Sequence, residues 1–285
     1  MKLSNAERAE VLVQALPYIQ EYYNRIVVVK YGGNAMINEE LKQAVMGDIV
    51  LLSLIGVKVV LVHGGGPEIT EMLAKVGKKT EFVDGLRVTD GETAEIVQMV
   101  LAGKINKSLV NLLQTKGGNA IGLCGMDGSM IEAKTKDERL GYVGEITNVN
   151  VKPILDVIDK GYIPVVSTVG CDSDGNAYNI NADTAAAKIA GELNAECLIS
   201  MTDISGILKD KDDPETLIKK ITLDEAQGLF DDNTISGGMI PKVECCIDAI
   251  KEGVKKVFIL DGRIPHAILI ETLTDEGLGT MVCEK

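Results

Sequence analysis

The sequence predicts an α/β protein whose open, mostly parallel central sheet is sandwiched by helices. Six short apolar runs alternate along the 285 residues with segments of helical period. These runs are continuously apolar rather than alternating in polarity, which is typical of strands covered on both faces. Strands that alternate with helices indicate parallel pairing through helical crossovers.

The expected elements follow one another in order along the chain. The predicted strands are residues 26–30, 57–62, 120–124, 163–167, 196–201 and 256–260. The predicted helices are residues 39–55, 66–76, 91–114, 151–160, 182–193 and 239–252. The polar stretch 170–180 suggests a lobe boundary, and the polar stretch 209–216 predicts a surface loop or hairpin. We therefore expect an N-terminal helix within 1–24, an N-lobe over 25–175 and a C-lobe over 176–285.

The residues before the first strand predict a separate amphipathic helix. Ser4 and Glu7 have the spacing of a capping box, and Pro17 is expected to kink the helix. Apolar side chains recur at helical spacing on one face, at Leu12, Leu16, Ile19 and Tyr23. Such a terminal helix usually packs on its own domain; the alternative is a surface for a partner.

Composition limits the classes of function. A hydrophobic fraction of 46% and a charged fraction of 25% are ordinary for a soluble globular protein. We expect a cytoplasmic protein, because there is neither an apolar run of about 18 residues nor a secretory h-region. A net charge of −13 and 4% aromatic residues argue against nucleic-acid binding. The six cysteines lack C-x-x-C spacing and are expected to be buried free thiols.

Two glycine-rich turns follow the first two predicted strands. "KYGG" occupies 30–33 and "HGGG" occupies 63–66. Glycines between a strand and a helix let backbone N–H groups approach an anion and direct the helix dipole toward it. Neither turn has the P-loop spacing, and no G-x-G-x-x-G follows a strand. Either turn alone could be purely structural, but two of them, one carrying Lys30, favour a phosphate site.

Four further stretches carry polar groups. Arg87 in "DGLRVTD" suits a bidentate carboxylate clamp, although a lone arginine is more often in a surface ion pair. In "NINAD", Asn181 or Asp183 could be only a helix cap. "TISGGMIPK" places glycines before a helix that carries Lys242. "TDISGIL", over 202–208, ends a strand, where ligands gather in open α/β sheets.

Taken together and in order, these motifs resemble the amino acid kinase family, from about residue 26 to the C-terminus. "GLRVTD" points to members that phosphorylate N-acetyl-L-glutamate rather than carbamate, aspartate, glutamate or UMP. The resemblance implies transfer of the γ-phosphoryl group of ATP to the side-chain carboxylate, the second step of arginine biosynthesis. The alternatives are a sibling kinase with another acceptor and a non-catalytic sensor on the same fold. The missing dinucleotide fingerprint disfavours an NAD-dependent oxidoreductase.

The resemblance also implies the roles of individual residues. The matching catalytic positions are Lys30, Lys242 and Asp183. The matching acetylglutamate positions are Gly65, Gly66, Arg87 and Asn179. The matching ATP positions are Gly32, Gly33, Asp203, Ile204, Ser205, Gly206, Ile207, Leu208, Gly237, Gly238 and Met239, together with Lys242. Mg²⁺ is expected to be held mainly by the nucleotide, with no metal site on the protein.

The two ends of the chain resemble the arginine-sensitive members of the family. Their N-terminal helices interlace and link three dimers into a hexamer, so a hexamer inhibited by L-arginine is expected here. The positions that match the arginine site are Tyr22, Lys209, His266, Glu271 and Gly277. The alternative is that the C-terminal segment merely closes the sheet. A PII-type signalling protein is left open as a further partner.

Overall fold

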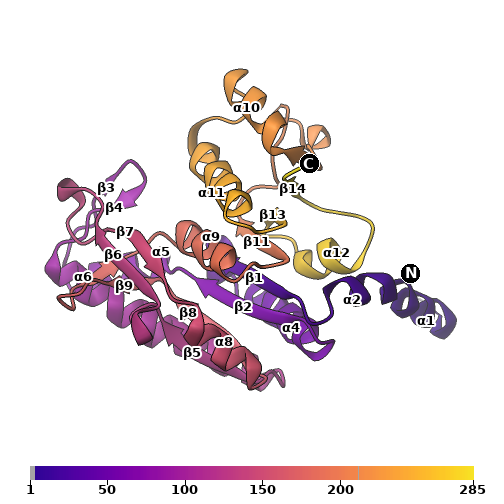
Figure 1. The fold of residues 1–285 in the computed structure, drawn as a ribbon, viewed down its shortest axis with the longest axis horizontal. Helices are drawn as coiled ribbons and strands as arrows, with labels where there is room; N and C mark the ends of the chain where they lie inside the picture. The colour runs from indigo at the N-terminus through magenta and orange to yellow at the C-terminus, as the bar shows by residue number, and fades with distance from the viewer. Residues whose placement is uncertain (1–3, 211) are drawn as a thin grey trace.

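The computed structural model describes residues 4–210 and 212–285 and has a three-layer α/β/α architecture (Figure 1). Its central sheet has eight strands in the order β12-β14-β13-β11-β1-β2-β8-β5. Their bounds are β1 Ile26–Tyr31, β2 Lys58–His63, β5 Ala120–Cys124, β8 Ile163–Ser167, β11 Cys197–Thr202, β12 Lys220–Thr222, β13 Lys256–Asp261 and β14 Thr280–Cys283. Each neighbouring pair in this sheet is parallel except β13–β14. The predicted fold class is confirmed.

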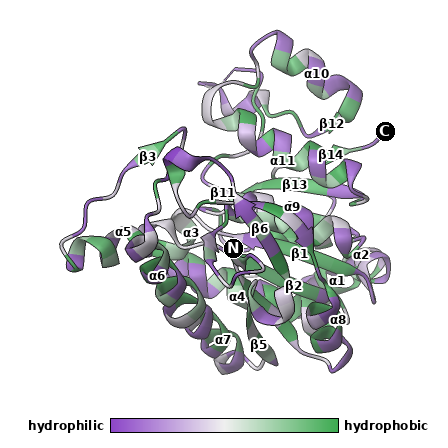
Figure 2. Cartoon of the chain, turned by 60° about the vertical axis from the view of Figure 1, so that its left-hand side comes forward, coloured by the Kyte–Doolittle hydropathy of each residue, from purple (hydrophilic) through white to green (hydrophobic). Residues whose placement is uncertain are grey.

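Successive side chains of the strands point into two separate cores. Val27 and Val29 of β1 belong to one core, and Val28 belongs to the other. The first core is covered by α4 Glu39–Leu54, α5 Gly66–Lys75, α6 Gly91–Gln98, α7 Asn106–Thr115 and α12 Ala267–Leu273. The second is covered by α8 Lys152–Asp159, α9 Ala182–Glu192, α10 Leu223–Asp231 and α11 Ile240–Lys251. Figure 2 shows the central strands as hydrophobic, as burial on both faces requires.

The N-terminal segment forms two short helices, α1 Asn5–Gln14 and α2 Leu16–Tyr22. The capping box is confirmed, because the Ser4 hydroxyl accepts from the Glu7 N–H while the Glu7 carboxylate accepts from the Ser4 N–H. Where a kinked helix was expected, the helix is instead divided in two just before Pro17, which lies in the first turn of α2.

The expectation that this segment packs on its own domain is wrong for α1. The helix has no buried residue, and Figure 1 shows it extending away from the rest of the chain. Leu12 is 75% exposed and Leu16 is 51% exposed. Tyr22 in α2 is instead buried in the core, whereas Tyr23 is exposed. The apolar stripe of α1 is therefore left uncovered by the part of the chain that the structure describes.

Several elements were not predicted. A four-stranded sheet in the order β10-β9-β6-β7 lies beside the main sheet, with bounds β6 Ile131–Thr135, β7 Gly144–Val149, β9 Val169–Cys171 and β10 Ala177–Asn179. The polar stretch 170–180 thus contains most of the β9–β10 hairpin. A second hairpin joins β3 Phe82–Val83 and β4 Leu86–Arg87. The expected helix 91–114 consists of α6, a π-helix over Met99–Ile105, and α7.

The remaining elements are short. They are α3 Asn34–Ile37 and the 3₁₀ turns Asp127–Ser129, Glu138–Leu140, Pro214–Thr216 and Gly237–Met239. Residues 209–210 and 212–216 belong to a surface hairpin, as predicted, since the N–H of Lys209 donates to the carbonyl of Thr216. All six cysteines are free thiols, as predicted, four of them buried. Among the described residues, no helix combines the length and the apolar character that crossing a bilayer demands.

Candidate active site

Three neighbouring strands end at the same edge of the sheet. β1 pairs in parallel with β2 and with β11, and Lys30 lies level with Val62 and Ser200 on those strands. The carboxyl ends of parallel strands meet at one edge, where open α/β sheets bind their ligands. Both glycine turns and the stretch 202–208 therefore open into one crevice.

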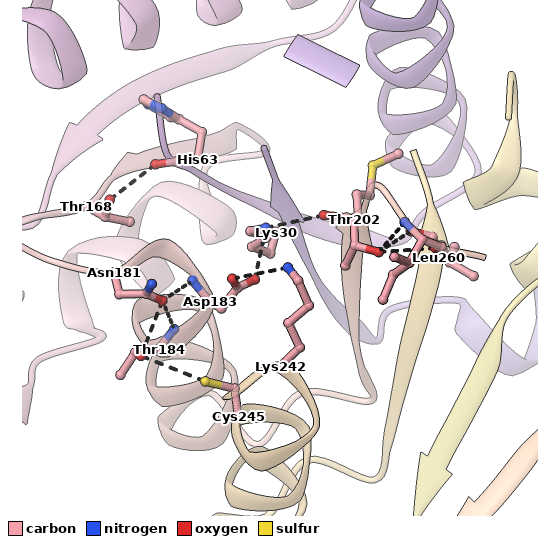
Figure 3. Close-up of polar contacts among 12 residues, drawn as sticks. Lys30, His63, Thr168, Asn181, Asp183, Thr184, Thr202, Lys242, Cys245 and Leu260 are labelled. Carbon is pink, nitrogen blue, oxygen red and sulfur yellow. Dashed lines mark hydrogen bonds and ion pairs between the residues drawn. The ribbon is translucent and has the colours of Figure 1, made fainter. Parts of the chain in front are cut away.

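Asp183 lies between the two lysines singled out in the sequence (Figure 3). Its Oδ1 atom is 2.9 Å from Lys30 Nζ, and its Oδ2 atom is 3.8 Å from Lys242 Nζ. Lys30 comes from the central strand β1, whereas Lys242 comes from the first turn of α11. Helices α9 and α11 pack against each other, which brings Asp183 and Lys242 together. The structure thus joins three residues separated by up to 212 positions of sequence.

The charge on Asp183 is held in place by its surroundings. Burial raises the pKa of this carboxyl, but the ammonium groups of Lys30 and Lys242 and a hydrogen bond with Ser200 outweigh burial, so the net shift of the pKa is downward. Asn181 caps α9 by accepting from the N–H groups of Asp183 and Thr184. The carboxylate therefore also lies at the positive end of a helix dipole.

Sequence reasoning missed two groups that complete this cluster. Lys30 Nζ donates to the carbonyl of Met201 at 3.2 Å, and Ser200 bonds to Asp183. Both groups come from β11, the strand next to β1. Ser200 had a weak signal in the sequence, as a polar residue inside the apolar run "CLISM". A backbone carbonyl such as that of Met201 leaves no signal in a sequence.

Both glycine turns leave space at the crevice. A side chain at Gly32 would put its Cβ 3.3 Å from Lys30 Nζ. Gly33 has φ +68°, and a Cβ there would lie 2.7 Å from the Asp203 carboxylate. Gly65 is the N-cap of α5 and makes no side-chain cap, so the first N–H groups of that helix have no partner within it. These N–H groups can serve an anion.

A cavity of about 190 Å³ adjoins the turn after β2. It is lined by all the predicted acetylglutamate positions, Gly65, Gly66, Arg87 and Asn179. The β3–β4 hairpin supplies one wall, and β10 supplies another. The side chain of Asn179 donates to the Thr89 hydroxyl at 3.3 Å, which fixes its orientation in the wall.

Arg87 is not in a surface ion pair, so that alternative is wrong. The residue is only 7% exposed and lies in strand β4 rather than in a loop. Its guanidinium donates to the carbonyl of Gly66 at 2.9 Å and to the hydroxyls of Thr70 at 2.9 Å and Thr80 at 3.3 Å. Burial lowers its pKa, although a guanidinium stays charged. A guanidinium carries five N–H donors, so these three bonds leave capacity for a ligand carboxylate.

The predicted ATP positions come from two parts of the chain: Gly32 and Gly33 follow β1, and the others lie within 203–208 and 237–242. Asp203, Gly237 and Gly238 are exposed, whereas Gly206 and Ile207 are buried. The Ile207 side chain belongs to the core, and its N–H donates to the Thr280 hydroxyl at 2.8 Å. A second cavity of about 380 Å³ is lined by Asp183, Gly238, Lys242 and Cys245, among others. Burial raises the pKa of the Cys245 thiol.

The residues of the predicted arginine site are only partly brought together. Glu271 accepts from the N–H groups of Leu278 and Gly279, which places it against the Gly277 loop. Tyr22 is a core residue of α2, the helix that packs on α12. His266 Nδ1 lies 2.6 Å from Asp48 Oδ1 on α4. Lys209 is exposed on its hairpin.

The chain is similar in sequence to one family of proteins. Residues 25–261 match the amino acid kinase family. An acetylglutamate kinase of Brachyspira hyodysenteriae is 57% identical over 281 residues, covering 98% of each chain. An acetylglutamate kinase of Clostridium beijerinckii is 55% identical over 283 residues, covering 98% of this chain and 99% of that protein.

Solved structures show the same fold. N-acetylglutamate synthase from Neisseria gonorrhoeae, complexed with coenzyme A and N-acetyl-glutamate, superposes with a TM-score of 0.84 at 25% identity. The match covers 97% of this chain and 63% of that one. Carbamate kinase from Giardia lamblia bound to AMP-PNP superposes with a TM-score of 0.67 at 18% identity, over 92% of this chain and 99% of that one. The second likeness concerns the fold alone.

Proposed function

The chain belongs to the amino acid kinase family and is a kinase, and we propose that its acceptor is the side-chain carboxylate of N-acetyl-L-glutamate. A carboxylate oxygen attacks the γ-phosphorus of ATP, the bond from that phosphorus to the β,γ-bridging oxygen breaks, and ADP leaves. The products are ADP and N-acetyl-L-glutamyl 5-phosphate. The observation that carries the proposal is the Lys30–Asp183–Lys242 cluster beside a cavity that contains Arg87 and Asn179.

The chemistry of the acceptor explains which residues the site needs. A carboxyl group with a reference pKa of about 4.3 is already ionised at neutral pH, so no general base is required. The obstacle is repulsion between an anionic nucleophile and an anionic phosphoryl group. In this proposal Lys30 and Lys242 each direct an ammonium at the transferring group, and Asp183 keeps the two cations close together.

The remaining parts of the site bind and orient the two substrates. Gly65 and Gly66 offer backbone N–H groups to the phosphoryl group, and Arg87 with Asn179 binds the α-carboxylate of acetylglutamate. The stretches 203–208 and 237–239, with Gly32 and Gly33, enclose ATP. Mg²⁺ on the nucleotide neutralises phosphate charge when bound. The proposal assigns the metal no ligand from the chain, and the described residues contain no group of three or more His, Cys, Asp or Glu that could hold one.

We further propose that each of the two lobes binds mainly one of the two substrates. Residues 25–175 bind acetylglutamate, joined by Asn179, and form a dimer interface, and residues 176–285 bind ATP, joined by Gly32 and Gly33. The protein works in the cytoplasm, in arginine biosynthesis. The test is an ATP-dependent acyl-phosphate assay with acetylglutamate, glutamate, aspartate, carbamate and UMP. Acetylglutamate is expected to give by far the highest kcat/KM, and a preference for any other acceptor would overturn the assignment.

Feedback inhibition by arginine through a hexamer is the regulatory part of the proposal. The uncovered apolar side chains of α1, which include Leu12, support a surface for neighbouring subunits. Glu271 lies against the Gly277 loop, so its carboxylate could pair with the guanidinium of arginine while nearby backbone binds the amino-acid end. Inhibition requires that arginine bind one arrangement of the ring more tightly than another. Enzyme activity measured against arginine concentration tests this part separately.

A further inference from the structure

The proposed function gives no role to a histidine buried directly beside the glycine turn. His63 is the last residue of β2, is 0% exposed and precedes Gly64. Burial lowers its pKa to about 4, so the imidazole is neutral near neutral pH. A neutral imidazole has one N–H donor and one acceptor nitrogen, and the partners of the ring decide which is which.

The orientation of the neighbouring Asn106 amide is fixed by its own partners. Asn106 is 1% exposed, and its side-chain nitrogen lies 2.8 Å from the Val165 carbonyl and 3.2 Å from the Leu123 carbonyl. Its side-chain oxygen lies 3.1 Å from Lys107 Nζ. Carbonyl oxygens only accept and an ammonium only donates, so the nitrogen must face the two strands and the oxygen must face the lysine.

The amide of Asn106 in turn fixes the tautomer of His63. The Asn106 side-chain nitrogen is 3.2 Å from His63 Nε2 and shares its two N–H donors among Nε2 and the two carbonyls. An amide nitrogen does not accept a hydrogen bond, so a proton on Nε2 would have no acceptor there, and Nε2 must be the acceptor. The ring proton is therefore on Nδ1, which lies 3.0 Å from the Gly64 carbonyl and donates to it. Hydrogen bonds thus connect β5 and β8 to Asn106 at the start of α7, Asn106 to His63, and His63 to the Gly64 carbonyl in the turn.

This hydrogen bond controls the direction of an N–H group at the crevice. The Gly64 carbonyl and the Gly65 N–H belong to one planar trans peptide, in which the two groups point in opposite directions. Since His63 holds the carbonyl toward the interior, the Gly65 N–H must point away from it. The cavity lined by Gly64, Gly65 and Gly66 adjoins this peptide.

The packing beneath the turn supports the same arrangement. Leu101 and Ile105 of the π-helix lie where a Cβ at Gly65 would be, at 2.8 Å for Leu101 Cδ2. The π-helix ends directly before Asn106. Short π-helical segments inside α-helices are frequently found at functional sites. A side chain at Gly122 of β5 would collide with the Asn106 amide, so that glycine leaves the space the amide occupies.

We propose that His63 and Asn106 are positioning residues that direct the Gly65 N–H toward the transferring phosphoryl group. Neither side chain touches the substrate; each acts through the peptide between Gly64 and Gly65. The catalytic part of this inference rests on the proposed function, whereas the tautomer and the direction of the peptide do not.

The first experiment observes the tautomer without any substrate. The chain has two histidines, so labelling with ¹⁵N-histidine gives two imidazoles, which His266→Asn assigns. The expected spectrum for His63 shows a proton on Nδ1 and no change between pH 6 and 8. A proton on Nε2, or titration near the ordinary value of about 6.5, would overturn the proposal. This result stands whether or not acetylglutamate is the acceptor.

The second experiment compares two substitutions of His63 that each keep one half of its bonding. An asparagine amide can place its nitrogen near the position of Nδ1 and keep the bond to Gly64, whereas a glutamine amide reaches the position of Nε2. His63→Asn is expected to keep kcat within about threefold. His63→Gln is expected to lower kcat by about 10²-fold, the size of effect that a small misplacement of a catalytic group produces, with KM for ATP nearly unchanged.

Asn106→Ala provides a second variant if His63→Gln does not fold. Like His63→Gln, it is expected to lower kcat. Its spectrum is expected to show both tautomers of His63. Asn150→Ala is the matched control, because Asn150 donates to the Gly128 carbonyl far from the crevice, and kcat should not change. Two results would show that His63 and Asn106 have a merely structural role. One is an equal kcat for His63→Asn and His63→Gln. The other is an Asn106→Ala variant with a lowered melting temperature but an unchanged kcat. An inactive wild type with the expected tautomer would instead refute the proposed function.

Discussion

The two lysines that flank Asp183 are supported by very different parts of the molecule. Lys30 lies on a strand with neighbours on both edges, its side chain is 8% exposed, and it contacts Asp183 at 2.9 Å. Lys242 lies in the first turn of a helix after an exposed glycine turn, its side chain is 31% exposed, and its distance is 3.8 Å. Lys30 is therefore held more firmly by the core than Lys242, and we expect Lys242 to move more when a ligand binds.

Substitution of either lysine should have the largest effect on kcat, but only one of the two substitutions should also affect stability. Lys30→Ala and Lys242→Ala should each lower kcat by roughly 10²–10³ or more, because each removes a cation aimed at transition-state charge. Only Lys30→Ala should also lower the melting temperature clearly, since it takes away the closer and more buried partner of Asp183. Steady-state kinetics and thermal unfolding measure the two effects.

Lys255→Ala is a suitable control for both lysines. Lys255 pairs with Glu196 at 2.7 Å, but its side chain is 57% exposed and the pair lies outside the crevice. Its kcat and melting temperature should stay close to wild type. Activity within about threefold of wild type in either active-site variant would remove that lysine from the mechanism.

Asp183→Asn should have the next largest effect. The two ammonium groups lose the charge that holds them together, so kcat should fall at least tenfold. The lysines hold the folded-state pKa of Asp183 below its ordinary value of about 3.9. The stability contributed by its charge is therefore present above that value and is lost as pH falls through the lower folded-state pKa.

Urea unfolding between pH 7 and pH 3 measures this contribution. The difference in the free energy of unfolding between wild type and Asp183→Asn should be largest at neutral pH and should shrink once the pH falls below about 4. A difference that stays constant over the whole range would show that the charge of Asp183 does not stabilise the fold.

Arg87→Lys should have a smaller effect, confined to the cavity beside the turn after β2. Lysine keeps the charge but loses the planar fork that can bind a carboxylate twice. The KM for acetylglutamate should rise about 10–100-fold, as expected for one charge-assisted interaction, while the KM for ATP should change little. An effect on ATP alone would place Arg87 in the nucleotide site.

Removal of residues 1–15 should change catalysis least. This deletion takes away α1, which has no buried residue, but keeps Tyr22 in the core. The kcat on acetylglutamate should stay within about twofold, while the solution mass falls from hexamer to dimer and inhibition by arginine weakens. A full-length dimer that is indifferent to millimolar arginine would refute the regulatory proposal alone.

The parts of the fold that were predictable are those with continuous apolar runs. The run at 26–30 is strand β1, and the other five runs overlap strands of the main sheet. The second sheet was missed because its strands are short and partly polar, as in "IEAKT", where buried and exposed residues alternate. The π-helix was missed because its residues continue the helical pattern of the flanking helices.

The site was predictable where a motif carries the charged group itself. The resemblance named Lys30, Asp183 and Lys242, and the structure brings all three together. It could not supply the role of Asn106, whose partners on β5 and β8 lie 17 and 59 positions away along the chain. The sequence pattern alone favoured packing of the N-terminal helix on its own domain, which is wrong for α1, because an apolar stripe does not say whether its cover lies on the same chain.

The most direct test of the shared phosphoryl-transfer centre is a crystal structure with ADP, N-acetyl-L-glutamate and aluminium fluoride, which mimics the transferring phosphoryl group. Both ammonium groups are expected within hydrogen-bonding distance of the fluoride, with Asp183 still between them. Lys242 should have moved farther than Lys30 from its present position. A fluoride out of reach of either lysine, with both substrates bound, would contradict the account.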